Sequence, residues 1–293
     1  MELGKIKNQR EIRFFGIRRS GNHAVIGWIF DNYPGVVIHC NNINQKYCKK
    51  INEINQIDPY ICFGNIHLKG VNYWTCKQKI LGLIKNLITR NKTLGFSIKD
   101  PLLKKESIRH IKHKDCLILS YEDRHLAQVC SVQFESQRES LLGQSEKRYD
   151  ILLLRDPYNL FASLMKAKFI SPKNKQYYVD LWKEYAREYI GETNNLSQTK
   201  IVINYNQWFS DIEYRNNLSK KLEFQALNTT YKKVPSFGKG SSFSGTEFNN
   251  NAQEMPVLDR WKYFKDDAFY KEILADAELV NLSEQIFGAI ASL

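Results

Sequence analysis

The chain has 293 residues, of which 43% are hydrophobic and 13% aromatic, so its composition excludes a disordered protein and suits a buried core. Lysine and arginine outnumber aspartate and glutamate by 43 to 31, and the resulting charge of +12 attracts anionic partners. The six cysteines form no CxxC pair and no zinc-like cluster with histidine. We therefore expect free thiols in a reducing compartment and no metal site.

The sequence offers no signal for secretion or membrane insertion. Its first residues, MELGKIKNQREIRF, lack an apolar signal core, and its longest apolar runs are too short to span a bilayer. We expect a cytoplasmic protein that does not act at a membrane.

Short apolar segments typical of strands alternate with longer segments of helical period. Strands are expected at 12–17, 36–39, 116–121, 150–155 and 200–205, and helices near 22–33, 76–90, 156–168, 174–191, 206–223 and 256–287. This alternation favours a three-layer α/β fold, with a mostly parallel central sheet and helices on both faces, in a single domain over 1–293. Because such sheets bind ligands where their strands end, the residues after each strand are the candidate site.

The first expected strand runs directly into a polar turn and then into helix 22–33. This strand–turn–helix unit directs backbone amides and the positive end of the helix at one point, where phosphate or sulfate would bind. The candidate ligands are Arg18, Arg19, Ser20, Gly21, Asn22 and His23. The spacing of Gly16 and Gly21 fits part of the P-loop pattern, but Asn22 and His23 stand where that pattern needs Lys and Ser or Thr. An ATP or GTP site is therefore disfavoured.

A second motif lies at YDILLLRDPYNLFASLMKA, residues 149–167. The buried strand ends at Arg155, and Asp156 and Pro157 are typical of a helix N-cap and first turn. Ser163 follows on that helix, so Arg155 and Ser163 can bind one anion together. A structural arginine and an ordinary helix serine are the alternative.

Residues 234–251, VPSFGKGSSFSGTEFNNN, are rich in Gly, Ser and Asn and show no period. Long loops in compact domains are often functional, and Gly238, Lys239 and Gly240 could present amides and a cation to an anion. A plain surface loop is the alternative.

Together, RRSGN after the first strand and LLLRDPYNLFAS later in the chain resemble the sulfotransferases that use 3′-phosphoadenosine-5′-phosphosulfate, PAPS. The resemblance implies that residues 18–23 bind the 5′-phosphosulfate and that Arg155 and Ser163 bind the 3′-phosphate. It places GKGSSF over the nucleotide and Tyr205 near the adenine, where a packed core tyrosine is the alternative. The closing segment, LDRWKYFKDDAFYKEILADAELVNLSEQIFG, is similar to bacterial and especially cyanobacterial members.

The resemblance implies transfer of the sulfuryl group from PAPS to a hydroxyl or nitrogen of a small molecule, with release of adenosine 3′,5′-bisphosphate and no metal. It suggests a tailoring enzyme of natural-product biosynthesis, and sulfation of a saxitoxin-type alkaloid is one such setting. The acceptor pocket is expected in the variable segments 40–75 and 123–148.

The resemblance also implies catalytic roles. Arg19 stands where the family usually has a lysine, and it would stabilise charge on the leaving oxygen. Glu122, at the end of a strand, is the expected base that removes the acceptor proton, and His125 is the alternative base.

Other functions stay open on the sequence alone. A P-loop-type kinase would need the missing Lys and Ser or Thr, and a nucleic-acid-binding protein would need clustered basic residues with interleaved aromatics. The basic residues are scattered, so no nucleic-acid partner is expected. A sulfotransferase-like protein that binds the nucleotide without catalysis is a further alternative.

Overall fold

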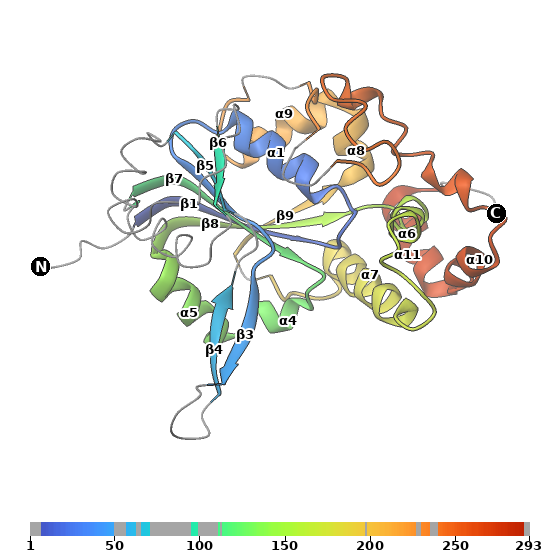
Figure 1. Ribbon diagram of the computed structural model, residues 1–293, viewed down its shortest axis with the longest axis horizontal. Coiled ribbons are helices and arrows are strands. Elements are labelled where there is room, and N and C mark those ends of the chain that lie inside the picture. Colours follow the sequence, from blue (N-terminus) through green and yellow to red (C-terminus); the bar gives the residue numbers. More distant parts are fainter. Residues whose placement is uncertain are drawn as a thin grey trace, which may run out of the picture. The chain divides into compact units, whose positions relative to one another are not determined.

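The computed structural model describes residues 7–49, 57–62, 66–70, 95–98, 111, 113–196, 198–226, 230–234 and 240–289. Its main sheet has seven strands in the order β6-β5-β2-β7-β1-β8-β9 (Figure 1). These are β1 (Lys7–Gly16), β2 (Val37–Cys40), β5 (Ile66–Lys69), β6 (Gly95–Ile98), β7 (His113–Glu122), β8 (Gln144–Leu154) and β9 (Thr199–Asn204). Two further strands, β3 (Asn44–Lys49) and β4 (Ile57–Cys62), form an antiparallel pair.

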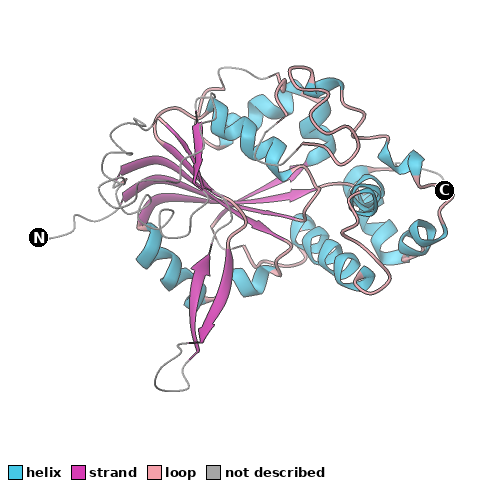
Figure 2. Ribbon diagram, in the orientation of Figure 1, coloured by secondary structure: helices cyan, strands magenta, loops and turns pink. Residues whose placement is uncertain are grey.

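All five predicted strands are confirmed, and the mixed α/β fold with a mostly parallel sheet is the predicted one. Strand β2 pairs in parallel with β7 and antiparallel with β5, and β5 pairs antiparallel with β6. The antiparallel strands were not predicted from the sequence. Figure 2 distinguishes the helices from the strands of the described residues.

The helices begin and end largely as their caps dictate. They are α1 (Asn22–Asn32), α4 (Leu126–Val129), α5 (Val132–Leu142), α6 (Pro157–Lys166), α7 (Lys175–Ile190), α8 (Tyr205–Ser210), α9 (Ile212–Lys221), α10 (Ala268–Leu274) and α11 (Ala277–Phe287), with 3-10 turns η2 (Ala252–Glu254) and η3 (Arg260–Tyr263). The predicted helix 206–223 is wrong in one respect, because Asp211 ends α8 and caps α9 by accepting from the Glu213 amide. The predicted helix 256–287 is likewise divided, since Asp267 and Asp276 cap α10 and α11 separately.

The predicted helix 76–90 lies outside the described residues, as does much of the predicted acceptor segment 40–75. Among the residues that the structure does describe, no helix is both long enough and apolar enough to cross a membrane.

Contacts divide the chain into two compact units. The first comprises 1–14, 33–122 and 126–150, and the second comprises 15–32, 123–125 and 151–293. Strands β1 and β8 each contribute residues to both units. In the second unit, α1, α8 and α9 lie on one side of β9 and α7 lies on the other (Figure 1).

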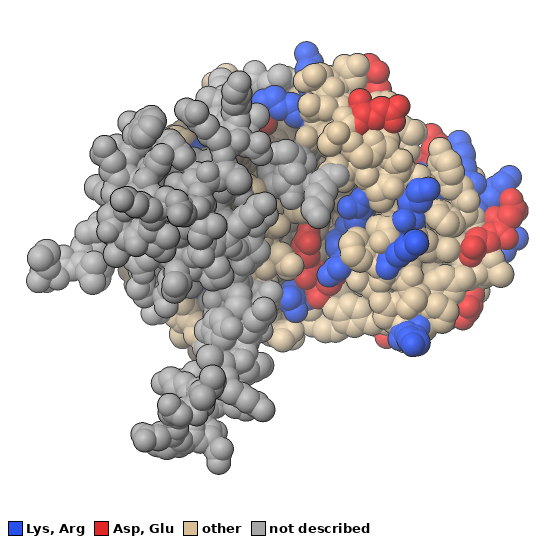
Figure 3. All heavy atoms as spheres, in the orientation of Figure 1, with Lys and Arg blue, Asp and Glu red and all other residues tan. Residues whose placement is uncertain are grey.

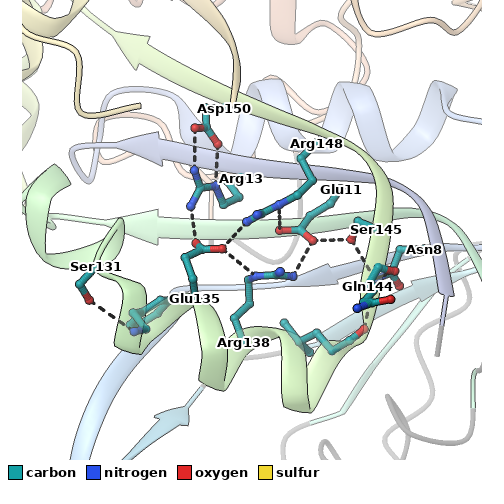
Figure 4. Close-up of polar contacts among 12 residues, drawn as sticks. Asn8, Glu11, Arg13, Ser131, Glu135, Arg138, Gln144, Ser145, Arg148 and Asp150 are labelled. Atoms are coloured by element: carbon teal, nitrogen blue, oxygen red, sulfur yellow. Dashed lines mark hydrogen bonds and ion pairs between the residues drawn. The ribbon is translucent and has the colours of Figure 1, made fainter. Parts of the chain in front are cut away.

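The first unit contains a buried ionic network between β1, β8 and α5 (Figure 4). The Arg13 guanidinium donates two hydrogen bonds of 2.6 Å to the Asp150 carboxylate and a third to Glu135. Arg138 donates to Glu11 at 2.7 Å, and Arg148 donates to Glu135 at 2.5 Å. Every arginine of this network therefore has a carboxylate partner.

Candidate anion-binding site

The turn between β1 and α1 is tightly specified. The Ser20 amide donates to the Ile17 carbonyl at 3.1 Å, and the helical hydrogen bonds begin where Ala24 donates to Gly21 at 2.9 Å. Gly21 has φ +99°, and a Cβ there would lie 2.0 Å from the Tyr205 ring. Only glycine suits both the backbone conformation and the close approach, so Gly21 fixes the turn against α8.

Arg18, a predicted anion ligand, is held by a carboxylate. Its amide donates to Asp123 Oδ1 at 2.7 Å, its Nε forms an ion pair with Asp123 Oδ2, and its guanidinium lies 4.8 Å from the centre of the Phe169 ring. Asp123 is buried, so the positive charge of Arg18 is largely compensated. In this structure Arg18 positions the turn.

Arg19 makes a contact of its own through its backbone. Its backbone is left-handed, with φ 68°, and its carbonyl accepts a 3.1 Å hydrogen bond from Arg155 Nη1. The positive charge of Arg19 contributes to lowering the pKa of Arg260. Of the two neighbouring arginines, Arg19 belongs to an arginine cluster and Arg18 does not.

Arg155 and Ser163 meet, as their spacing predicted. Asp156 caps α6 by accepting from the Asn159 amide at 2.8 Å, which fixes the helix directly after the strand. Arg155 Nη1 then donates to Ser163 Oγ at 3.2 Å, across eight residues of sequence. The Ser163 hydroxyl donates in turn to the Asn159 carbonyl at 2.7 Å.

Arg155 is 1% exposed and also has a structural role. Its Nη2 donates to the Val257 carbonyl, and its guanidinium lies 5.2 Å from the centre of the Tyr205 ring. Its Nε is buried and has no hydrogen-bond partner among the described residues. Burial lowers the pKa of Arg155. No carboxylate in the described part of the chain forms an ion pair with this guanidinium.

Arg260, which the sequence analysis did not identify, completes the site. Its Nη1 donates to Ser163 Oγ at 3.0 Å, so Arg155 and Arg260 share one hydroxyl acceptor. Its Nη2 donates to Ser241 Oγ at 2.8 Å, and its backbone amide donates to Asn159 Oδ1 at 2.8 Å. The structure thus joins η3 to α6 through one buried arginine.

The surroundings of Arg260 disfavour its charged form. Burial and repulsion from Arg155 and Arg19 lower the pKa of Arg260 to about 9, although the Tyr205 hydroxyl opposes that shift. At neutral pH the guanidinium remains charged. Neither Arg155 nor Arg260 has an ion-paired carboxylate within the residues described, so a bound anion would relieve their repulsion. We call Arg19, Arg155 and Arg260, with Ser163, the arginine cluster.

Tyr205 begins α8 instead of ending the strand, and its ring is 4% exposed. The ring stacks on Trp208 at 5.9 Å and lies against Gly21. The packed position matches the alternative that the sequence left open, a core tyrosine that supports Gly21 and Arg155.

The loop after residue 234 is described only in part, and the predicted ligands Gly238 and Lys239 lie outside the described residues. Gly240 has φ +78°, and a Cβ there would meet the Gly245 carbonyl. Ser241 and Gly245 exchange backbone hydrogen bonds, and the Phe243 ring lies 5.1 Å from the Arg260 guanidinium. The described part of this loop therefore packs onto the arginine cluster.

The other predicted ligands belong to the turn. Ser20 is 1% exposed, and Asn22 is 3% exposed and donates to the Ile17 carbonyl at 3.1 Å. His23 is half-buried at the start of α1. Ser20 and Asn22 thus stabilise the turn that holds Arg19.

The two candidate bases lie in different surroundings. Glu122 is the last residue of β7, half-buried, and belongs to the first unit. His125 belongs to the second unit, where its Nδ1 forms a 2.6 Å hydrogen bond with Glu184 Oε2. Glu184 could not be identified from the sequence, because 59 residues separate it from His125.

The described residues also bear on a metal site and on a nucleic-acid-binding surface. They contain no group of three or more His, Cys, Asp or Glu side chains that could hold a metal ion. On the face drawn in Figure 3, lysine and arginine side chains lie in separate groups, several of them beside acidic residues. In comparisons with known proteins, no protein-family model and no curated protein matches this chain.

Proposed function

We propose that this protein is a sulfotransferase that moves the sulfuryl group of PAPS to a small-molecule acceptor. The observation that carries the proposal is the arginine cluster. Buried Arg155 and Arg260 share the Ser163 hydroxyl, and neither has an ion-paired carboxylate among the described residues. A buried charge without a partner is costly, so such a cluster favours an anionic ligand.

The side chains of the arginine cluster are of the kinds that bind a phosphate group such as the 3′-phosphate of PAPS. Guanidinium groups bind phosphate oxygens through parallel N–H donors. The Ser163 hydroxyl would add a further donor by turning its proton from the Asn159 carbonyl to the phosphate. Arg155, Arg260 and Ser163 would hold the 3′-phosphate. The turn at Arg19, Ser20 and Gly21, with the amino end of α1, would hold the 5′-phosphosulfate.

The proposed reaction forms one S–O bond and breaks another. An acceptor oxygen attacks sulfur, the bond from sulfur to the bridging oxygen breaks, and the electron pair stays with the 5′-phosphate of the released adenosine 3′,5′-bisphosphate. Arg19 would stabilise the negative charge that develops on that oxygen. The proton of the acceptor passes to a base on the protein.

The decisive experiment is calorimetric titration with adenosine 3′,5′-bisphosphate in the absence of magnesium. We expect micromolar binding to the wild type and at least ~100-fold weaker binding to Arg155→Met, a loss of about 2.7 kcal/mol. Arg187→Met is the matched control, because Arg187 is a partly exposed arginine of the same unit that pairs with Glu278.

Each alternative function predicts a different result when the ligand of the titration is changed or when turnover of PAPS is measured. Binding of ATP–magnesium without binding of adenosine 3′,5′-bisphosphate contradicts the proposal and favours a kinase. Steeply salt-dependent binding of DNA or RNA in its place favours a nucleic-acid-binding protein. Binding of the nucleotide with no turnover of PAPS favours a binding protein without catalysis.

A further inference from the structure

The turn that would hold the phosphosulfate is itself held by a residue from elsewhere in the chain, Asp123. We infer that Asp123 is a positioning residue, which sets the shape of this turn and so acts on the 5′ end of the nucleotide without touching it; this inference rests on the proposed function. Asp123 directly follows β7, is buried, and belongs to the same compact unit as the turn.

Asp123 binds the turn at three points. Its Oδ1 accepts from the Arg18 amide at 2.7 Å, and its Oδ2 forms an ion pair with Arg18 Nε. Its own amide donates to the Gly16 carbonyl at 3.3 Å. An ion pair alone would leave the main chain of the turn unconstrained, so the two backbone hydrogen bonds are what give Asp123 control of the turn's conformation.

The turn needs this support because its backbone is strained at Arg19. Arg19 has φ 68°, a left-handed conformation that costs free energy for a residue with a Cβ and persists only where the surroundings hold it. On one side of Arg19, Asp123 fixes the amide of Arg18. On the other side, Arg155 Nη1 donates to the Arg19 carbonyl at 3.1 Å. The strained residue therefore lies between two fixed peptide groups.

Asp123 is itself held firmly by α7. The Tyr177 hydroxyl donates to the Asp123 carbonyl at 2.7 Å, and the Tyr178 hydroxyl donates to Asp123 Oδ2 at 3.5 Å. The backbone of Asp123 is also left-handed, with φ 53°. A positioning residue is effective only when its own geometry is locked by packing and hydrogen bonds, and these contacts meet that requirement.

The conformation of the turn decides which groups face the anion. The Gly21 amide donates to none of the described residues, so it remains a donor for a ligand. The Arg19 side chain starts from the strained residue, so its direction depends on the φ angle that Asp123 helps to set. Relaxation of this angle would move the Arg19 guanidinium and the amides that follow it, and small displacements of such groups weaken binding and catalysis strongly.

The test compares two ligands by calorimetric titration of the full-length chain. Adenosine 3′-monophosphate carries only the phosphate proposed for the arginine cluster, whereas adenosine 3′,5′-bisphosphate adds the phosphate proposed for the turn. We expect Asp123→Ala to weaken bisphosphate binding at least ~10-fold, the size of effect found for groups that orient metal ligands, and to change monophosphate binding less than about twofold. A merely structural role would not separate the two ligands.

Two further variants complete the test. Asp123→Asn keeps an oxygen that accepts from the Arg18 amide but loses the charge, so it should fold and weaken bisphosphate binding less than Asp123→Ala does. Asp211→Ala is the matched control, because Asp211 also accepts from a backbone amide, that of Glu213, in the same unit. Its affinities for both ligands should equal those of the wild type.

The outcomes separate this inference from the proposed function. If the Asp123 variants weaken the binding of both ligands equally, or of neither, the inference is wrong and the proposed function stands. A wild type that binds the two ligands equally tightly would also overturn the inference, because the turn would then add nothing to binding. Failure of the wild type to bind the bisphosphate contradicts the proposed function itself.

Discussion

Two groups of buried arginines in this molecule have opposite electrostatic surroundings. In the first unit, Arg13, Arg138 and Arg148 face Glu11, Glu135 and Asp150, and each guanidinium has a carboxylate partner. In the second unit, the hydrogen bonds of Arg155 and Arg260 go to hydroxyls, carbonyls and a thioether.

The difference indicates two roles for the same side chain. Burial and attraction act in opposition in the first unit, where burial would lower the pKa of Arg13 but the hydrogen bonds and charge of Asp150 raise it above its ordinary value. Burial and repulsion act together in the second unit, where they lower the pKa of Arg260 to about 9. The arginines of the first group are neutralised by carboxylates of the protein. Arg155 and Arg260 of the second group have no ion-paired carboxylate among the described residues, which is why we propose that they bind an anion.

The largest expected effect comes from removing a carboxylate of the first group. Asp150→Ala leaves Arg13, which is 1% exposed, without its two-bond partner. Breaking a buried ion pair in this way typically costs about 3–5 kcal/mol, and we expect a loss of that size in the free energy of unfolding measured with urea. Asp150→Asn keeps the shape of the side chain, and its free energy of unfolding should lie between those of the wild type and Asp150→Ala. A loss below about 1 kcal/mol would show that the network does not stabilise the fold.

Substitution in the second group should change nucleotide affinity much more than stability. Arg260→Met removes a repelling charge, and Ser163 and Ser241 keep other hydrogen-bond partners. We expect its stability to stay within about 1 kcal/mol of the wild type, whereas its affinity for adenosine 3′,5′-bisphosphate falls ~100-fold, equivalent to about 2.7 kcal/mol. Urea denaturation and calorimetry measure the two quantities on one sample. A variant that unfolds without losing affinity would place Arg260 with the structural arginines.

Part of this contrast was predictable from the sequence. The spacing of Arg155 and Ser163 across one helix start was sufficient, because a strand end and a helix face have fixed geometry. Arg260 was not predictable, since 97 residues separate it from Ser163 and only the tertiary fold brings them together. Its local sequence, LDRWKYF, reads as an ordinary continuation of a helix.

The elements of the fold were likewise predictable only where the local sequence carries a clear signal. Buried strands such as ILLL are evident from their apolar runs, whereas β5, with the sequence IHLK, and β6, with GFSI, have too few apolar residues to stand out. The helix breaks at Asp211, Asp267 and Asp276 did carry a signal, because aspartate is a favoured N-cap. The ion pair between Arg18 and Asp123 was not predictable for another reason, since nothing local in the sequence shows that Asp123 binds it.

The nucleotide should stabilise the folded protein only where the second group of arginines is intact. A nucleotide that binds only the folded state should raise the free energy of unfolding by about 2.7 kcal/mol at 100 times its Kd. We expect adenosine 3′,5′-bisphosphate to raise the unfolding temperature of the wild type and of Asp150→Asn alike. At the same concentration the ~100-fold weaker binding of Arg260→Met should leave it a stabilisation of only about 0.4 kcal/mol. Thermal denaturation with and without the nucleotide measures this shift. An equal shift in Arg260→Met would place the binding site elsewhere in the chain.

The smallest expected effect is the pH dependence of the first group. Burial opposes ionisation of Glu135, but attraction to Arg13, Arg148 and Arg138 outweighs it and lowers the pKa of Glu135. A carboxyl whose pKa is lower in the folded state contributes stability above its unfolded value of about 4.3, and the contribution is lost as the pH falls through the folded value. Because Glu135 is partly exposed, we expect Glu135→Gln to remove only on the order of 1 kcal/mol at pH 7. Urea denaturation between pH 3 and 7 should show a shallower acid limb for this variant, whereas Arg260→Met should keep the wild-type slope, since its site has no carboxylate ion pair to lose among the described residues.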